Sequence, residues 1–532
     1  MAEVQGMRCL RVGRVWLATV CACGLLPSAA SAARGTAVPP TGCAPARAAE
    51  AYHATGQALN PAPRTLVPCA TQTGFYTGET GIGVTQQGTV WFSAANWEWQ
   101  LARTDDDGAH WQAFTVPGPQ ADPGCYAGTN ALTDCDTSEQ GKYNTVADAY
   151  LYVDPYTSKI FWSKTYGLGV CSSLSMSADD GATWTPVTRF ACPGGDYEKL
   201  AAGPPPAGAP APTGYPDVVY GCVNGPAPVF VAGPGRVCYK SLDGGVTWSV
   251  AGAPLPSPLA PGCLEFQEPQ RVGPDGTLYL PLNCAAASGS NPVGLVRVAV
   301  SHDEGTTWSY GQVPTGNTGS SAGLIGGVSL DVDRAGTLYV VWPGADGRVY
   351  LATSDDQAQT WNGPFAVSPP GVRQSGPPFA QVSAREPGHF AIAFYGYTGS
   401  DSTRLNGYLT ESFDGRDADP LLYTVELNDP SQPLYFPVKS GSLPRNDFLG
   451  VTIAPDGTAW TGLVKLLSDT PDSQGYIQST GFAGRLVSAG EHPSSHPAAR
   501  MLAKRQRHRR ARPRRGTRRR RHRHGTHTTP AR

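Results

Sequence analysis

Trp97, Glu98 and Trp99 place two indole rings at alternate positions around a carboxylate. If both rings are exposed, their faces can stack on the apolar faces of sugars, which makes Trp97 and Trp99 candidate sugar-binding residues. The alternative is packing between strands, because aromatic residues two positions apart on a strand point to the same face and are often buried there.

Several other patterns that carry chemistry are missing from the sequence. It has no G-x-S-x-G segment, no phosphate-binding loop, no H-E-x-x-H segment and no EF-hand loop. The acidic run at 104–108 lacks the ligand spacing and the closing glutamate of a calcium loop. We therefore expect neither a metal ion nor a cofactor.

The sequence contains 13 cysteines, three of which lie in the export signal described below. An even number in an exported chain favours disulfides, and a zinc site is the weaker alternative because no C-x-x-C pair occurs. Ten cysteines allow many pairings, but their spacing groups them into neighbours. We expect five local bridges, Cys43–Cys69, Cys125–Cys135, Cys171–Cys192, Cys222–Cys238 and Cys263–Cys284.

Five segments share the pattern Ser/Thr-x-Asp-x-Gly-x-Thr-Trp, with His110 in place of Thr in the first and Ala358 in place of Gly in the last. Asp and Ser/Thr side chains bond to nearby backbone amides, and glycine adopts the positive φ of a tight turn. Each segment, called a repeated turn below, is therefore predicted to close a hairpin whose next strand starts at the tryptophan. The aspartates and tryptophans are Asp106, Trp111, Asp179, Trp184, Asp243, Trp248, Asp303, Trp308, Asp356 and Trp361.

A second pattern, strand, Gly turn, strand, precedes most of the repeated turns and is clearest at 272–280, 332–342 and 454–460. One hairpin of each kind makes a four-stranded antiparallel sheet, and radial repetition of such sheets makes a β-propeller. The 64 glycines, 49 prolines and charged fraction of 16% argue against a helical bundle. We predict an all-β propeller, with seven blades favoured and six possible.

The repeated turns resemble the Asp boxes, or bacterial neuraminidase repeats, of the sialidase superfamily of β-propellers. The resemblance covers about residues 78–488 and implies the propeller fold. In such families the Asp boxes are structural turns placed away from the catalytic face, so the resemblance also implies a structural role for the five aspartates.

A sialidase binds its acidic sugar with three arginines and uses a tyrosine nucleophile with a glutamate, and an aspartate as acid/base. Glu268, in Phe-Gln-Glu-Pro-Gln before the Gly turn at 274–276, matches the position of the family's glutamate. The alternative is that Glu268 only opens an inner strand. The family's Arg-Ile-Pro motif is missing, and no arginine ends the strand that follows Glu268. Asp447, which precedes a further Gly turn, supports the resemblance and is assigned no chemistry.

The sequence divides into four parts. Residues 1–32 are predicted to be a signal peptide, because arginines precede an apolar stretch and a small-residue cleavage site, with lipidation at Cys21 or Cys23 as the alternative. Residues 33–77 are expected to be a lead-in segment, 78–488 the propeller and 489–532 a disordered basic tail. No later segment is apolar enough to be a transmembrane span.

The tail from 500 to 532 carries 15 Lys or Arg residues and no acidic residue, so it is expected to be disordered and to attract anionic polymers. It has no aromatic residue for stacking on bases, and we expect no sequence-specific binding of nucleic acid. The interpretation is a secreted, monomeric propeller that binds a glycan or an anionic envelope polymer without catalysis. The alternative is an exo-sialidase-type glycoside hydrolase with a diverged site.

Overall fold

The computed structural model describes residues 42–489 except 45, 94–99, 117–146, 166–171, 186–187, 191–195, 225–235, 254–262, 264–268, 286–293, 318–326, 375–379, 440–447 and 474. The chain divides into two compact units, Met1–Val38 and Pro39–Arg532, and all described residues belong to the second. The predicted signal peptide, the basic tail and Cys125, Cys135, Cys171 and Cys192 lie outside the described residues.

The described residues form β-strands joined by turns and loops, without a helix. Six sheets have four antiparallel strands each. In chain order of their innermost strands, five of them are β4(Ile82–Val84), β5(Val90–Ser93), β6(Gln100–Thr104) and β7(Gln112–Thr115); β8(Ala147–Val153), β9(Ile160–Thr165), β10(Ser172–Ser177) and β11(Thr188–Phe190); β12(Asp196–Gly203), β13(Val218–Asn224), β14(Arg236–Ser241) and β15(Ser249–Gly252); β16(Arg271–Val272), β17(Leu278–Ala285), β18(Gly294–Ser301) and β19(Ser309–Asn317); and β20(Ser329–Val332), β21(Leu338–Pro343), β22(Val349–Ser354) and β23(Asn362–Ala366).

The two remaining sheets combine strands from both ends of the chain. The sixth four-stranded sheet contains β29(Gly450–Ile453), β30(Ala459–Leu466), β31(Ser479–Ser488) and, as its outer strand, β3(Leu66–Gln72). The enlarged sheet has seven strands, which are β25(Gln381–Ala384), β26(Phe390–Thr398), β27(Asn406–Ser412), β28(Leu421–Glu426), β24(Val372–Arg373), β1(Glu50–His53) and β2(Ala58–Leu59).

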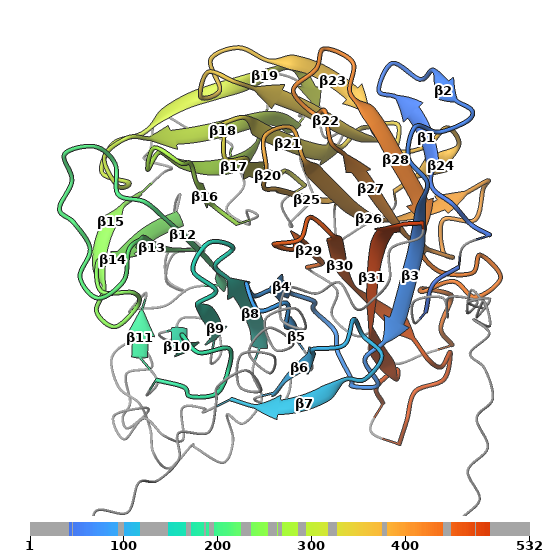
Figure 1. The fold of residues 1–532 in the computed structure, drawn as a ribbon, viewed down its shortest axis with the longest axis horizontal. Helices are drawn as coiled ribbons and strands as arrows, with labels where there is room; N and C mark the ends of the chain where they lie inside the picture. The colour runs from blue at the N-terminus through green and yellow to red at the C-terminus, as the bar shows by residue number, and fades with distance from the viewer. Residues whose placement is uncertain are drawn as a thin grey trace, which may run out of the picture. The chain divides into compact units, whose positions relative to one another are not determined.

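The sheets stand around a common centre like the blades of a propeller (Figure 1). Their innermost strands contact one another in a closed cycle of the order β4, β8, β12, β16, β20, β25, β29 and back to β4. The predicted all-β propeller of four-stranded blades is confirmed, with the enlarged sheet taking one place in a cycle of seven.

The ring begins earlier in the chain than the sequence indicated. β3 pairs along its whole length with β31, from Leu66 opposite Ser488 to Gln72 opposite Phe482, and β1 pairs with β28. The segment 33–77, expected to be a lead-in, therefore supplies strands to two blades. The amino-terminal strand closes the ring because hydrogen bonds to β31 satisfy an edge that would otherwise be open.

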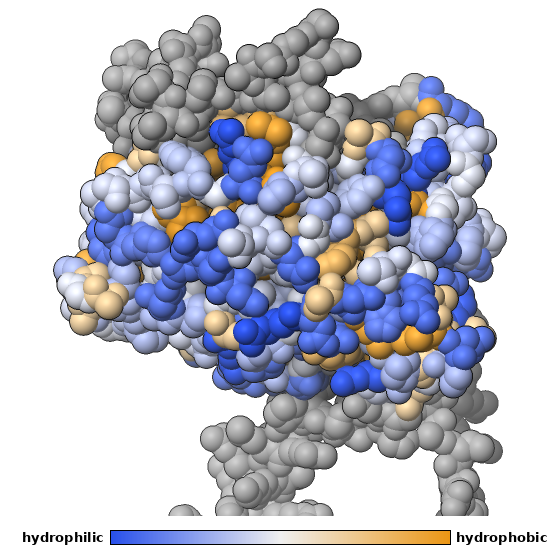
Figure 2. Space-filling model, turned by 90° about the horizontal axis from the view of Figure 1, so that it is seen from above, coloured by the Kyte–Doolittle hydropathy of each residue, from blue (hydrophilic) through white to orange (hydrophobic). Residues whose placement is uncertain are grey.

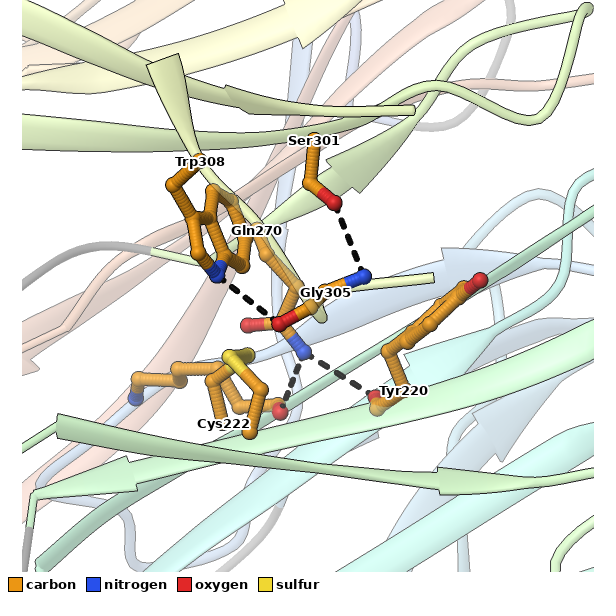
Figure 3. Close-up of a disulfide and its surroundings, with 8 residues drawn as sticks. Tyr220, Cys222, Gln270, Ser301, Gly305 and Trp308 are labelled. Carbon is orange, nitrogen blue, oxygen red and sulfur yellow. Dashed lines mark hydrogen bonds between the residues drawn. A yellow bond between two sulfur atoms is a disulfide. The ribbon is translucent and has the colours of Figure 1, made fainter. Parts of the chain in front are cut away.

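Three of the five predicted disulfides, Cys43–Cys69, Cys222–Cys238 and Cys263–Cys284, are present. In each, the cysteines are paired residues on adjacent segments of a sheet. Figure 3 shows Cys222 beside Gln270, whose side-chain amide donates to the carbonyl oxygens of Lys199 and Tyr220 at 2.7 and 3.0 Å. Cys222–Cys238 therefore reinforces the β13–β14 hairpin, and the other two bridges fasten the segments at Cys43 and Cys263 to β3 and β17.

The interior of the blades is apolar, and the tryptophans Trp91, Trp162, Trp342 and Trp460 on second strands are almost fully buried. Figure 2, turned by 90° from Figure 1, shows one face of the molecule, on which hydrophilic residues predominate and hydrophobic residues lie between them. Among the described residues, no helix is long and apolar enough to cross a membrane.

Each repeated turn joins the third and fourth strands of its blade, and one set of hydrogen bonds recurs in all five. In the fourth copy, Ser301 Oγ donates to Asp303 Oδ1 at 2.8 Å and accepts from the amide of Gly305 at 2.9 Å, while the amide and hydroxyl of Thr307 donate to Asp303 at 2.8 and 2.6 Å. In the first copy His110 Nδ1 lies 2.7 Å from Asp106 Oδ2 and takes the place of the threonine hydroxyl. Ala358, in place of glycine, adopts a φ of 67°.

The residue between the aspartate and the glycine of each repeated turn, called the linking residue below, contacts the preceding blade. Its φ is positive in all five copies, between 57° and 72°. Four linking residues make this contact with their side chains, through ion pairs or hydrogen bonds. The pairs are Asp107–Arg485 (3.1 Å), Asp180–Thr89 (2.6 Å), Glu304–Lys240 (2.5 Å) and Gln357–Asp275 (2.8 Å). In the remaining copy the linking residue is Gly244, and its carbonyl oxygen accepts from Lys159 Nζ. The repeated turns therefore join neighbouring blades as well as closing hairpins.

We predict that Asp303→Ala destabilises the protein by about 1–2 kcal/mol, because the carboxylate organises the amide and hydroxyl donors of its turn. Burial acts to raise the pKa of Asp303, but hydrogen bonds from Thr307 and Ser301 outweigh it and hold that pKa below its ordinary value. The stabilisation is therefore present above pH about 4 and is lost as the pH falls through the folded-state pKa. Urea unfolding across this range tests the prediction, with Asp303→Asn as the control, because the amide oxygen still accepts but does not titrate. An acid dependence that is the same in Asp303→Asn and the wild type would contradict it.

We predict that Lys240→Met destabilises the protein by about 3 kcal/mol, since the Glu304 carboxylate, with a side-chain exposure of 7%, is left buried without its cation. The double variant Lys240→Met/Glu304→Gln removes both charges and is expected to regain most of the loss. A double-mutant cycle in urea measures the coupling between the two blades. Additive effects of the two substitutions would rule out the interaction.

Candidate functional site

Two cavities, of about 90 and 50 Å³, lie along the centre of the ring. The larger is lined by residues from all seven innermost strands and extends to the turns that follow them, so it is called the turn-side cavity. The smaller includes Thr80, Pro269 and Phe448, which precede innermost strands, and is called the loop-side cavity. Together they form the central channel, where side chains from different blades meet.

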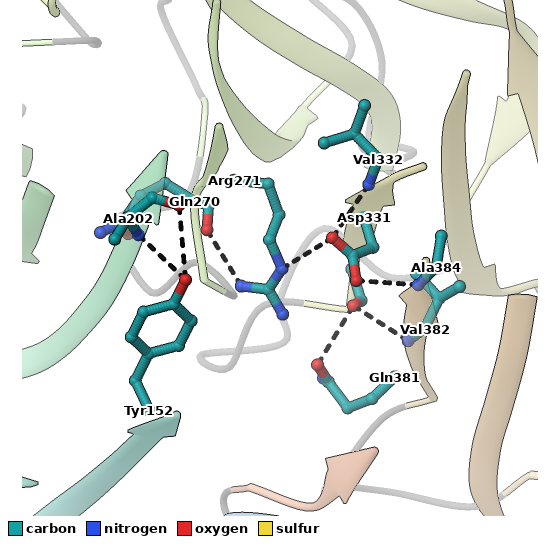
Figure 4. A network of polar contacts seen from close by, with 10 residues as sticks. Tyr152, Ala202, Gln270, Arg271, Asp331, Val332, Gln381, Val382 and Ala384 are labelled. Carbon is teal, nitrogen blue, oxygen red and sulfur yellow. Dashed lines mark hydrogen bonds and ion pairs between the residues drawn. The ribbon is translucent and has the colours of Figure 1, made fainter. Parts of the chain in front are cut away.

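An ion pair between neighbouring blades forms one wall of the turn-side cavity (Figure 4). Arg271 Nε donates to Asp331 Oδ1 at 3.1 Å, and Arg271 Nη1 donates to the carbonyl oxygen of Gln270 at 2.9 Å. The other oxygen of Asp331 accepts from the amide of Ala384 at 2.8 Å, which links a third blade. Burial raises the pKa of Asp331, and the positive charge of Arg271 opposes that shift. The carboxylate of Asp331 is thus the counterion of Arg271.

Tyr156 closes the turn-side end of the channel. It lies in the turn after β8, yet its ring is 5.0 Å from the guanidinium carbon of Arg334 and 5.8 Å from that of Arg385. Those arginines follow β20 and β25, which are not neighbours of β8 in the cycle. The tyrosine therefore reaches across the axis, and it remains 42% exposed.

The turn that carries Tyr156 is held by a buried carboxylate. Asp154 Oδ1 accepts from the amide of Tyr156 at 2.8 Å, and Asp154 Oδ2 accepts from the hydroxyls of Thr157 and Tyr215. Asp217, on the same β12–β13 connection as Tyr215, also bonds to Asp154. Burial, with the charge of Asp154, raises the pKa of Asp217 to about 7. The two carboxyl groups thus fasten this connection to the turn of the neighbouring blade.

In the loop-side cavity, Lys199 likewise contacts side chains from other blades. Its ammonium group lies 2.9 Å from the centre of the Phe448 ring and 4.7 Å from that of Tyr150, on segments of two other blades. The position over an aromatic face stabilises the cation in a site of low exposure. The described residues that line the two cavities include three cationic side chains, Lys199, Arg271 and Arg385, and a single carboxylate, Asp331.

The sugar-binding candidates Trp97 and Trp99 and the catalytic candidate Glu268 lie outside the described residues, as does Asp447. The five aspartates of the repeated turns lie in the turns between third and fourth strands, on the same edge of their blades as the turns between first and second strands. Among the described residues, no three His, Cys, Asp or Glu side chains lie close enough together to hold a metal ion.

The channel residues were missed in the sequence, although one signal could have found them. In the strand, Gly turn, strand pattern, the amide of the first turn residue donates to the carbonyl oxygen of the residue that ends the turn. Arg271 and Asp331 each stand two residues before that first turn residue. Tyr152, Ser383 and Thr452 hold the same place before their own turns, and all five line the turn-side cavity. Alignment of these hairpins predicts the inward-facing position, but not which inward side chains meet.

No protein-family model matches the chain, and no curated protein matches it. Among solved structures, the chain is similar to a mutant of the NanB sialidase from Streptococcus pneumoniae, at 10% identity and a TM-score of 0.38, over 83% of this chain and 92% of that one. It is also similar to a mutant of the Aleuria aurantia lectin, at 14% identity and a TM-score of 0.37, over 68% and 99%. The intramolecular trans-sialidase from Ruminococcus gnavus matches at 14% identity and a TM-score of 0.34, over 74% and 92%. At these values none of them assigns an activity to this chain.

We predict that Asp217→Asn stabilises the protein at pH about 8 and flattens its pH dependence. Because the pKa of Asp217 is raised to about 7 in the folded state, the folded protein retains a proton that the unfolded chain releases near pH 4. Stability therefore falls as the pH rises from about 4 to about 7, and the amide, which donates without titrating, avoids that loss. Urea unfolding at several pH values measures it, with Asp456→Asn on an exposed turn as the control. An equal slope in Asp217→Asn and the wild type would refute the prediction.

Proposed function

We propose that this chain is a secreted, non-catalytic binding protein for anionic glycans or cell-envelope polymers. The observation that carries the proposal is Tyr156, an exposed aromatic ring at the end of the channel with the guanidinium of Arg334 at its face. An exposed aromatic face stacks on a sugar ring, and a neighbouring arginine pairs with an acidic substituent. The three disulfides agree with a protein that works outside the cell.

The electrostatics of the channel support an anionic ligand. Lys199, Arg271 and Arg385 outnumber the single carboxylate, Asp331, so the described lining residues carry an excess of positive charge. A concave site with an excess of one charge attracts ligands of the opposite charge. The basic tail, which we propose to be disordered, adds attraction to polyanions that does not depend on sugar.

The lining residues also favour binding over hydrolysis. A sialidase mechanism needs a glutamate to activate its tyrosine, and the described residues that line the two cavities include no glutamate. Glu386, near Tyr156, is already paired with Arg334 at 2.7 Å and is therefore a poor base. The alternative, a diverged exo-sialidase, would require Glu268.

We predict that Tyr156→Ala and Arg334→Gln each weaken binding of the full chain to oligogalacturonate by about tenfold. Calorimetry measures the affinity, and polyglutamate of equal charge serves as the second ligand because the tail attracts both. Wild-type protein is expected to prefer the sugar, and the variants are expected to lose that preference.

Arg416→Gln is the matched control. Arg416 is 45% exposed and pairs with Asp355, much as Arg334 is 42% exposed and pairs with Glu386. Arg334 lies 5.0 Å from the Tyr156 ring, whereas Arg416 lies in the turn after β27 of the enlarged sheet. Equal loss in Arg416→Gln, or no preference for the sugar in the wild type, would contradict the proposal. A fluorogenic sialoside tests the alternative: turnover that Glu268→Gln abolishes would show a hydrolase instead.

A further inference from the structure

Arg385 is a buried cation without a counterion of its own. Its side chain is 4% exposed, its Nε has no hydrogen-bond acceptor, and its Nη1 donates to the carbonyl oxygen of Ile453 at 3.5 Å, a long contact. The nearest carboxylate oxygen is Glu386 Oε1, 3.9 Å from Nε. That oxygen accepts from Arg334 at 2.7 Å, and the side chain of Glu386 is 48% exposed.

The other charged and titratable groups around Arg385 do not neutralise it. Asp331 is occupied by Arg271 and by backbone amides, and Asp154 is occupied by its own turn and by Tyr215. Burial raises the pKa of Tyr156, so its hydroxyl is neutral at physiological pH. Burial and the charge of Arg334 lower the pKa of Arg385, which is the effect expected of a cation in need of an anion.

The space beside Arg385 can hold such an anion. The turn-side cavity that it lines measures about 90 Å³, while one water molecule needs about 10–15 Å³ by the same kind of measure. Its described polar lining includes the guanidiniums of Arg271 and Arg385 and the side chains of Tyr156 and Thr452. A buried guanidinium that faces a polar cavity recovers the cost of its desolvation by binding an anion there.

We propose that the turn-side cavity is a binding site for a small monovalent anion, a halide or a carboxylate group, held by Arg385. The anion can be free in solution or can be the carboxylate of an acidic sugar, and only the second source rests on the proposed function. The site is internal to the ring and separate from the five repeated turns.

The test measures chloride-35 NMR line widths and melting temperatures of the full chain and of Arg385→Gln in sodium chloride and in sodium formate at equal ionic strength. Chloride and formate are expected to raise the melting temperature of the wild type more than that of Arg385→Gln, in a saturable way, because they bind the folded state at Arg385. Formate is expected to narrow the chloride signal by displacement, a result that needs no variant.

Arg385→Gln is expected to lose about tenfold in chloride affinity, and Arg416→Gln is expected to keep it. The basic tail is the same in the wild type and in both variants, so any difference in chloride affinity among them comes from the channel. An equal rise in melting temperature with chloride in Arg385→Gln and in the wild type, or unchanged chloride binding in Arg385→Gln, would overturn the proposal. If Arg385→Gln does not fold, the wild-type displacement by formate decides.

Galacturonate, with neutral glucose as its control, separates a free anion from the carboxylate of an acidic sugar. Displacement of chloride by galacturonate, with loss of oligogalacturonate binding in Arg385→Gln, supports the site with a sugar carboxylate as its occupant. Displacement by formate alone, with oligosaccharide binding intact in Arg385→Gln, supports a free anion. Chloride binding without any oligosaccharide binding in the wild type would refute the proposed function and leave the anion site standing.

Discussion

The structure depends on how each blade is joined to the one before it. A four-stranded blade buries one hairpin against the next blade, but apolar packing alone fixes neither the angle nor the order of the contact. The linking residues add directional polar bonds: Asp180 accepts from three groups of the preceding blade, Glu304 pairs with Lys240, and Gln357 donates to Asp275. In each of these turns the linking residue has a positive φ, and hydrogen bonds to the turn aspartate hold the turn around it. The turn aspartates therefore support the contacts between blades as well as their own hairpins.

The ring in turn creates the channel. Seven innermost strands converge, and the inward side chains that stand just before their turns are brought together although they are far apart in the chain. Arg271 meets Asp331 from the next blade, while Tyr156 and Lys199 reach segments across the axis. These contacts fill the centre of the ring. Among the described lining residues, the cationic side chains outnumber the carboxylates. Such an excess of positive charge attracts anions, and both proposals above rest on it.

Part of the fold could be predicted from interactions between residues that are close in the sequence. Ser301, Asp303 and Gly305 bond within seven residues of one another, so their spacing alone predicts a turn. The disulfides that are described join close neighbours in the sequence for the same reason. The strand of residues 66–72 escaped prediction because its partner, β31, lies at the other end of the chain. Long-range pairing leaves no periodic signal in the segment itself.

The sequence by itself determined the hairpins and the repetition of four-stranded blades, because the turns that close the hairpins depend on bonds between residues a few positions apart and the same pattern recurs along the chain. Only the tertiary structure decided which blade receives the amino-terminal strands, which side chains meet in the channel and which cation is left without a carboxylate. Arg385 is an ordinary arginine in the sequence. Its burial among Arg334, Tyr156 and Ile453 exists only after the ring closes, because distance in space, and not in sequence, sets electrostatic energy.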